Sequence, residues 1–193
     1  MTTDEMIINL LTKTKRPGIN KLITYLCQDT DYFTAPASTK YHSNYEGGLA
    51  EHSLKVMELW DKKNDLYQLN IPDDSIIICA LLHDLCKCNF YVKGKKNVKE
   101  GKKPDGRDNW VEKEVWDVDD KLPYGHGAKS VILLQRFIQL TEFEILAILH
   151  HMGVPESYSD KMAYNAAVEK CPAIITLHTS DVESSYLFEQ TVK

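Results

Sequence analysis

The feature that most constrains the fold is the apolar run SIIICALLHDLCK over residues 75–87. The segment Pro72-Asp73-Asp74 precedes it and is typical of a helix start, where acidic side chains favour the positive end of the helix dipole. A helix that is apolar on almost every side must be buried. His83 and Asp84 lie at its inner end, where an unpaired carboxylate is costly, so we expect Asp84 to face a cation.

Further helices are predicted by apolar side chains that recur at three- and four-residue spacing. Pro17-Gly18 separates the first two, Thr141 and Glu144 form a capping-box pattern, and Pro172 opens or kinks the last helix. The periodic positions are Ile7, Leu10, Leu11, Ile19, Leu22, Ile23, Leu26, Val56, Leu59, Trp60 and Tyr67. The sequence therefore predicts an all-α protein.

Composition bounds the class of protein. With 193 residues, 43% hydrophobic and 26% charged, the chain is expected to form one domain over 1–193. It has no apolar stretch of about 18 residues and an acidic start, which predicts a cytoplasmic protein without a membrane partner. A net charge of -5 disfavours long nucleic acid and favours a small phosphorylated partner. The odd number of cysteines argues against a disulfide framework, and Cys86 and Cys88 are interpreted as structural or incidental.

Residues 89–124 interrupt the helical pattern. Trp110–Val118 alternates as a strand does, and 93–103 is polar and contains glycine, so we expect a small β-hairpin insertion between two helices. Residues 93–103 carry six lysines and one glutamate, whereas 105–120 carry seven acids and two basic residues. The arms are expected to pair with each other, or the lysines form a lid over an anionic substrate.

Histidines and one further aspartate provide candidate partners for the His83-Asp84 pair, which alone is near chance expectation. Each is expected on a separate helix: His52, His126, the pair His150 and His151, and Asp181. Imidazoles and carboxylates that project from several helices into a core are how helical proteins build metal sites, including sites with two ions. Neighbouring imidazoles therefore favour a metal over a lysine as the cation beside Asp84.

With these residues the chain resembles the HD-domain metal-dependent phosphohydrolase superfamily, whose ligands occur in the order His, His-Asp, Asp. His52, His83-Asp84 and Asp181 match that order. The segments GGLAEHSLKV and ALLHDLCK resemble the HD domain of bacterial 3′-to-5′ exoribonucleases, and the resemblance extends over residues 41–187. It implies an HD-domain helical bundle with its core at 41–187 after N-terminal helices in 1–40. No nucleic-acid-binding barrel is predicted in 1–40, which argues against processive RNA degradation.

The additional histidines resemble the two-metal members of this superfamily. That resemblance implies that Asp84 bridges two ions and that His126, His150 and His151 hold the second. Adjacent helical residues point about 100° apart, so His150 and His151 share an ion only near a helix end, and His151 is favoured. The implied cofactor is one or two divalent ions among Mn, Fe, Co, Ni, Mg and Zn.

Three other side chains have expected roles. Lys87 lies three residues after Asp84, where it can neutralise a phosphoryl oxygen or instead cap the helix as a surface lysine. A lysine here resembles HD phosphodiesterases and nucleases rather than 5′-nucleotidases. His42 is expected to be structural or to bind substrate, and His178 to pack or hydrogen-bond near Asp181.

The resemblance implies a phosphohydrolase that acts on a phosphate ester of a nucleotide or of a short nucleic-acid end. Asp84 and Lys87 are the expected catalytic residues, and the attacking water is activated by metal. One alternative is an HD-type diiron oxygenase with Tyr41, Tyr45 and Glu46 as gating residues. Another is an HD sensor that binds a nucleotide without turnover.

Overall fold

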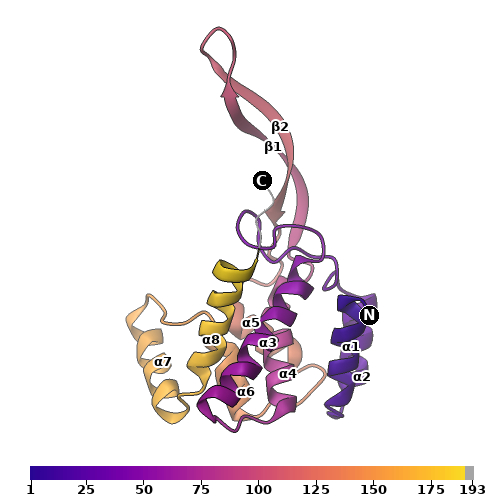
Figure 1. The fold of residues 1–193 in the computed structure, drawn as a ribbon, viewed down its shortest axis with the longest axis vertical. Helices are drawn as coiled ribbons and strands as arrows, with labels where there is room; N and C mark the ends of the chain where they lie inside the picture. The colour runs from indigo at the N-terminus through magenta and orange to yellow at the C-terminus, as the bar shows by residue number, and fades with distance from the viewer. Residues whose placement is uncertain (190–193) are drawn as a thin grey trace.

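The structure is a computed structural model that describes residues 1–189, and it is a helical bundle with one projecting hairpin (Figure 1). The predicted mostly helical fold is confirmed. The helices are α1 Thr3–Lys13, α2 Ile19–Gln28, α3 Gly48–Tyr67, α4 Asp73–Leu82, α5 His126–Leu134, α6 Glu142–Leu149, α7 Tyr158–Lys170 and α8 Ile174–Glu183. A 3-10 turn, η1, covers Leu85–Lys87, and a π-helical turn, η2, covers Ser184–Phe188.

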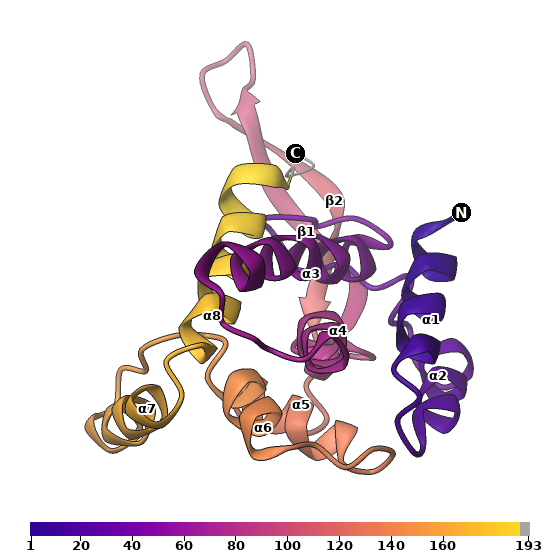
Figure 2. The same ribbon diagram turned by 60° about the horizontal axis from the view of Figure 1, so that its bottom comes forward.

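Helix α4 is the centre of the bundle, as its all-round apolar sequence predicts. Figure 2 shows it almost end-on, and it contacts α1, α3 and α6. Its residues from Ile76 to Leu82 are buried except for half-buried Ile77. Because α4 ends at Leu82, His83 and Asp84 lie inside the bundle rather than at its surface.

Side-chain contacts hold the flanking helices in place. Trp60 of α3 is fully buried, and its indole N–H donates to Thr176 Oγ1 of α8 at 2.7 Å. The predicted capping box at the start of α6 is present, with Thr141 and Glu144 as its two members. The Glu144 carboxylate also accepts hydrogen bonds from Arg16 and Ser75, which ties α6 to the N-terminal segment and to α4.

Helix α5 packs unusually close to α6. A Cβ atom at Gly127 would lie 2.3 Å from the Leu149 carbonyl oxygen, so no larger residue fits there without a shift. This close approach brings His126, the first residue of α5, beside the end of α6.

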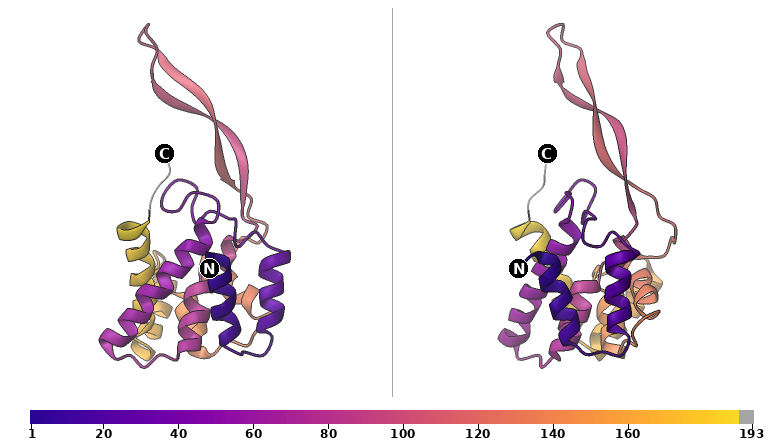
Figure 3. Two further views of the ribbon diagram at one scale, coloured as in Figure 1. Left: turned by 45° about the vertical axis from the view of Figure 1, so that its right-hand side comes forward. Right: turned by 90° about the vertical axis from the view of Figure 1, so that its right-hand side faces the viewer.

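The predicted hairpin is present as β1 Tyr91–Lys102 and β2 Asp108–Val118, paired antiparallel. It leaves the bundle as a twisted ribbon in both views of Figure 3. The predicted pairing of its charged arms is confirmed by four exposed cross-strand ion pairs between 2.8 and 3.3 Å. They are Lys95–Glu112, Lys96–Asp117, Lys99–Asp108 and Lys113–Glu100.

The five cysteines are free thiols. None of the helices within residues 1–189 combines the length and the apolar character needed to cross a bilayer.

Candidate metal centre

Five of the predicted ligands from four helices meet beside the C-terminal end of α4. His83 and Asp84 follow α4 directly, His52 comes from α3, His151 from the end of α6 and Asp181 from α8. The three imidazoles are fully buried, and Asp84 is 3% exposed. Such a concentration of polar groups in a core needs compensation.

One group of ligand atoms surrounds the Oδ2 side of Asp84. His52 Nε2 lies 3.3 Å from His83 Nε2 and 3.2 Å from Asp181 Oδ1. His83 Nε2 lies 3.5 Å from Asp84 Oδ2. Two ligand atoms that each lie about 2.1 Å from a tetrahedral ion are separated by about 3.4 Å. The separations of these atoms therefore suit one ion.

A second group faces Oδ1 of the same carboxylate. His151 Nε2 lies 3.4 Å from Asp84 Oδ1. On this side, ligand atoms of Asp84, Cys86 and His126 all lie within 4.8 Å of one another. Asp84 thus stands between two sets of donors, in the position that a bridging carboxylate requires.

Hydrogen bonds at Nδ1 orient the three buried imidazoles. The acceptors are the Ala80 carbonyl for His83 at 2.8 Å, the Ile148 carbonyl for His151 at 2.7 Å, and Glu189 Oε1 for His52 at 2.6 Å. Because these oxygens only accept, each Nδ1 carries the hydrogen and each Nε2 is directed at the carboxylates. Metal-binding histidines commonly have this arrangement.

The fully buried Nε2 of His151 has no hydrogen-bond partner among the described residues. Its neighbour, Asp84 Oδ1, is an acceptor as well. Two acceptors that face each other in a core are unfavourable unless a proton or a cation lies between them. The donor set and this unpartnered nitrogen therefore fit a divalent metal ion.

The charges around Asp84 are strongly coupled. Burial raises the pKa of the Asp84 carboxyl, but Lys87 and His83 outweigh burial and hold that pKa well below its usual range. Lys87 Nζ lies 2.6 Å from Asp84 Oδ2. Burial lowers the pKa of His52, but hydrogen bonds to Asp181 and Glu189 raise it to about 9. The carboxylates thus attract positive charge in the form of an ammonium and a proton.

The structure does not bring every predicted ligand to this centre. The His150 ring packs edge-on against Tyr164, with 5.5 Å between ring centroids, and His150 joins none of the ligand groups among residues 1–189. Adjacent residues at a helix end point about 100° apart, so the two rings cannot both face Asp84. In the turn that follows, Gly153 adopts a positive φ of 82° and its N–H donates to the His150 carbonyl. In this turn only His151 points inward.

The other two predicted histidines lie just outside the ligand cluster. His42 Nδ1 contacts Glu189 Oε2 at 2.9 Å, and His42 is half-buried. His178 Nδ1 lies 2.8 Å from the His151 carbonyl oxygen, so it supports the backbone of a ligand.

Sequence reasoning missed Glu189 and underrated Cys86. Glu189 accepts from His42, His52 and Ser184, and those hydrogen bonds hold its pKa below the usual range although burial raises it. No local pattern marks this residue, which follows the end of the family resemblance by two positions. The sequence does indicate that Cys86 could lie near the ligands, since this residue is only two positions from Asp84.

A cavity of about 460 Å³ opens onto this centre. It contains Asp84, Asp181, and both predicted substrate-binding residues, Lys87 and His42. The remaining lining residues are Tyr41, Met152, His178, Val182, Ser185, Tyr186 and Glu189. None of them belongs to β1 or β2, so the hairpin does not line this cavity, and a lid formed by its lysines stays a prediction. Four hairpin lysines, Lys95, Lys96, Lys99 and Lys113, pair with acids of their own ribbon, and Lys93 lies over the Trp116 ring.

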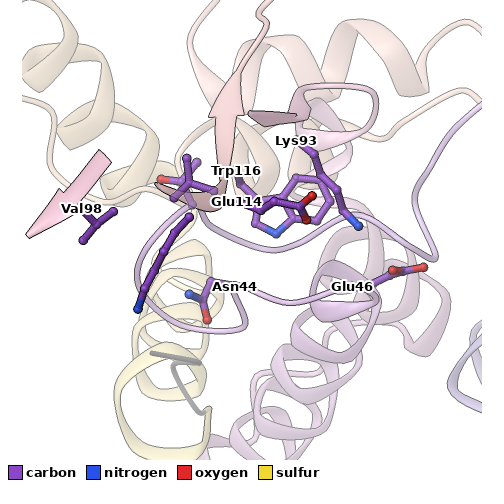
Figure 4. A pocket seen from close by; sticks show the side chains of 9 residues that line it. Asn44, Glu46, Lys93, Val98, Glu114 and Trp116 are labelled. Atoms are coloured by element: carbon purple, nitrogen blue, oxygen red, sulfur yellow. The ribbon is translucent and has the colours of Figure 1, made fainter. Parts of the chain in front are cut away.

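The hairpin lines a separate hollow of about 490 Å³ with the loop before α3 (Figure 4). Lys93, Glu114 and Trp116 form its hairpin side, and Asn44 and Glu46 its loop side. Of the three gating residues expected for an oxygenase, Glu46 thus lines this other hollow, and the Tyr45 hydroxyl donates to Glu51.

The structure thus defines a mostly helical protein with a buried His/Asp cluster suited to divalent metal. No model of a known protein family matches the chain, and no solved structure matches it.

Two curated proteins resemble parts of the chain. A dihydroneopterin 2′,3′-cyclic phosphate phosphodiesterase of Methanocaldococcus jannaschii is 40% identical over 63 residues, which is 31% of this chain and 25% of that protein. The 3′-5′ exoribonuclease YhaM of a Geobacillus species is 31% identical over 85 residues, 43% of this chain and 26% of that protein. The matched segments span about a quarter of each relative. One relative is named as a phosphodiesterase and the other as an exoribonuclease, which agrees with the resemblance to the HD-domain superfamily drawn from the sequence.

Proposed function

We propose that this chain is a divalent-metal-dependent phosphohydrolase that cleaves a phosphate ester of a nucleotide or of a short nucleic-acid end. The observation that carries the proposal is the set of three buried imidazoles, each held at Nδ1 with its Nε2 directed at a carboxylate. A bound metal ion would satisfy the three buried Nε2 atoms and the carboxylates, whereas burial of these polar groups without an ion costs free energy of folding.

The ligand groups support two ions that share Asp84. His52, His83, Asp84 and Asp181 would hold one ion. The other would lie on the Oδ1 side of Asp84, where His151 and His126 belong to two separate ligand groups that both contain Asp84. A donor set rich in imidazole suits Mn, Fe, Co, Ni or Zn better than Mg. A divalent ion bound here supplies positive charge and a water whose pKa is lowered toward neutrality.

Lys87 is placed to bind the phosphoryl group. Its side chain lines the cavity, and its ammonium contacts Asp84. Burial lowers the pKa of Lys87, but Asp84, Tyr91 and Asp181 together raise it above its usual value, so the ammonium stays charged at neutral pH. A fixed positive charge beside the cluster stabilises negative charge that develops on phosphoryl oxygens. His42, on the same cavity wall, offers a second contact to substrate.

The outer part of the cavity favours a nucleotide over a bare phosphate ester. Tyr41 and Tyr186 line the cavity while they remain 73% and 84% exposed. Exposed aromatic rings at the mouth of a polar cavity suit stacking on a nucleobase. The activities for which the two relatives are named, those of a cyclic-phosphate phosphodiesterase and an exoribonuclease, also support a phosphodiester substrate.

The direct test is turnover of a substrate panel by the full chain. Mononucleotides, 2′,3′-cyclic nucleotides and short RNAs are incubated with Mn, Co or Ni, in air and without oxygen. We expect release of phosphate or of a nucleotide product under both atmospheres. Turnover that requires iron and oxygen would support the oxygenase instead, and tight nucleotide binding without product would support a sensor.

The variant Asp84→Ala tests the assignment of the site. Loss of the shared carboxylate should lower metal affinity more than about 100-fold and abolish turnover, because both ligand sets contain this residue. Exposed Asp61 of α3 provides the control variant Asp61→Ala, which should behave as the wild type. Circular dichroism checks that helical content survives in both. Metal-dependent turnover by Asp84→Ala would contradict the assignment.

A further inference from the structure

We infer that Cys86 supplies a thiolate ligand to the ion on the Oδ1 side of Asp84, so that this second site selects zinc, cobalt or iron over manganese or magnesium. The inference rests on the metal centre of the proposed function. This inference adds a sulfur ligand to a predicted ligand set that contains only imidazoles and carboxylates.

The distances around Cys86 suit a shared ion. Its Sγ lies 3.3 Å from His126 Nδ1 and 3.9 Å from Asp84 Oδ1. A thiolate about 2.3 Å from a tetrahedral ion lies about 3.6 Å from a nitrogen or oxygen ligand of the same ion. The two observed separations lie on either side of that value. The Cys86 side chain is buried, which excludes water as a competing partner.

One contact positions both Cys86 and His126. Cys86 lies in the η1 turn, and its backbone N–H donates to Ser130 Oγ at 3.0 Å. Ser130 follows His126 by four residues on α5, so it lies one helical turn away on the same face. The hydrogen bond therefore holds the start of α5 against the turn that carries the thiol.

An independent observation points to a cation at the same carboxylate oxygen. The fully buried His151 Nε2 has no hydrogen-bond partner among residues 1–189 and lies 3.4 Å from Asp84 Oδ1. His151 Nε2 and Cys86 Sγ thus both lie close to Asp84 Oδ1, and each of these three atoms can donate an electron pair to a metal. Binding at Cys86 would release the thiol proton to solvent and form one metal–sulfur bond.

The other cysteines near α4 provide matched controls. Cys79 is also fully buried, but the partner of its Sγ is the Glu144 backbone carbonyl at 3.9 Å. Cys88 lies two residues after Cys86 and belongs to none of the ligand groups among the described residues. A thiol that only fills space in the core should behave as these two do.

The first experiment titrates the full chain with Co(II), to two equivalents per chain. Thiolate ligation produces a charge-transfer absorption band in the near ultraviolet, which imidazole and carboxylate ligands do not produce. We expect the band in the wild type and in Cys88→Ser, and its loss in Cys86→Ser. A wild type that binds two cobalt ions without the band, or a Cys86→Ser variant that keeps it, would overturn the inference and leave the proposed function intact. Absence of any cobalt binding would overturn both.

The second experiment needs no variant and so decides the question even if Cys86→Ser does not fold. X-ray absorption of the wild type loaded with two zinc ions should show sulfur at about 2.3 Å together with nitrogen and oxygen at about 2.0–2.2 Å. A first shell of nitrogen and oxygen alone would refute thiolate ligation.

Discussion

The histidine pair at the end of α6 shows how a shift of one residue position decides whether an imidazole faces Asp84. His150 and His151 are chemically identical and adjacent, yet one packs on Tyr164 and the other faces Asp84. The difference arises because adjacent residues at a helix end point about 100° apart. The turn that follows contains Gly153, where a Cβ atom would come within 2.6 Å of the His178 ring. Only a glycine permits this turn at such close approach.

We therefore expect unequal effects from two neighbouring alanine variants. His151→Ala removes a buried ligand and should lower the number of bound ions or weaken metal binding by about 10-fold or more. His150→Ala is the matched control and should keep metal stoichiometry and turnover, because this ring is outside the cluster. Metal content by elemental analysis measures both. Equal loss of metal in the two variants would show that His150 also binds.

Metal affinity should depend on pH through His52. Burial disfavours its protonation, but Asp181 and Glu189 outweigh burial and raise its pKa to about 9. Below pH 9 an ion must displace the proton from Nε2, so affinity should rise about tenfold per pH unit between pH 6 and 8 if one proton is released. Calorimetric titration with metal, in buffers of different ionisation enthalpy, measures how many protons are released when the ion binds. A pH-independent affinity would contradict this competition.

At the scale of elements, the hairpin and the bundle are largely independent. Its ion pairs at Lys95, Lys96, Lys99 and Lys113 connect β1 to β2 and leave no described lysine of the ribbon in the cavity at Asp84. Where the ribbon meets the bundle, Tyr91 contacts the Ala37 carbonyl.

A shortened hairpin tests this independence. Replacing 95–114 by an Asn-Gly turn keeps the paired residues at the base, such as Gly94 and Val115. Metal binding and turnover of a mononucleotide should be unchanged. The free energy of unfolding should change by no more than about 1 kcal/mol, because exposed ion pairs contribute little. If the shortened protein folds but loses turnover, the result would support the hypothesis that the ribbon acts as a lid over the substrate.

At the scale of the whole molecule, the candidate metal centre joins segments that are distant in sequence. Its proposed ligands come from α3, α5, α6, α8 and the end of α4, so an ion bound there would link most of the bundle. Such a site exists only in the folded chain, and metal binding should therefore stabilise the fold.

Thermal unfolding with and without metal measures that linkage. At a free metal concentration of 100 times Kd the stabilisation is about 2.7 kcal/mol. For a chain of this size the rise in Tm should be roughly 5–10 °C. A chelator should reverse the rise, and Asp84→Ala should not show it. An unchanged Tm at saturating metal would argue against a site that spans these helices.

Much of the fold was predictable because local pattern encodes it. The apolar run before His83 specifies a buried helix, Thr141 and Glu144 specify a helix start, and alternation after Trp110 specifies a strand. Each of these signals depends on residues within a few positions of one another. The proximity of His52, His83, Asp84 and Asp181 was not encoded locally: it was expected from ligand residue types on separate helices and from the family resemblance.

The sequence by itself thus determined a buried central helix that ends on His83 and Asp84, and a charged hairpin that pairs with itself. Only the tertiary structure decided which of two histidines faces the carboxylate, that Cys86 faces His126, and that Glu189 holds His52. The physical reason is distance along the chain. Glu189 and His52 are 137 positions apart, and contacts of this range arise from the packing of helices, which no local pattern of residues records.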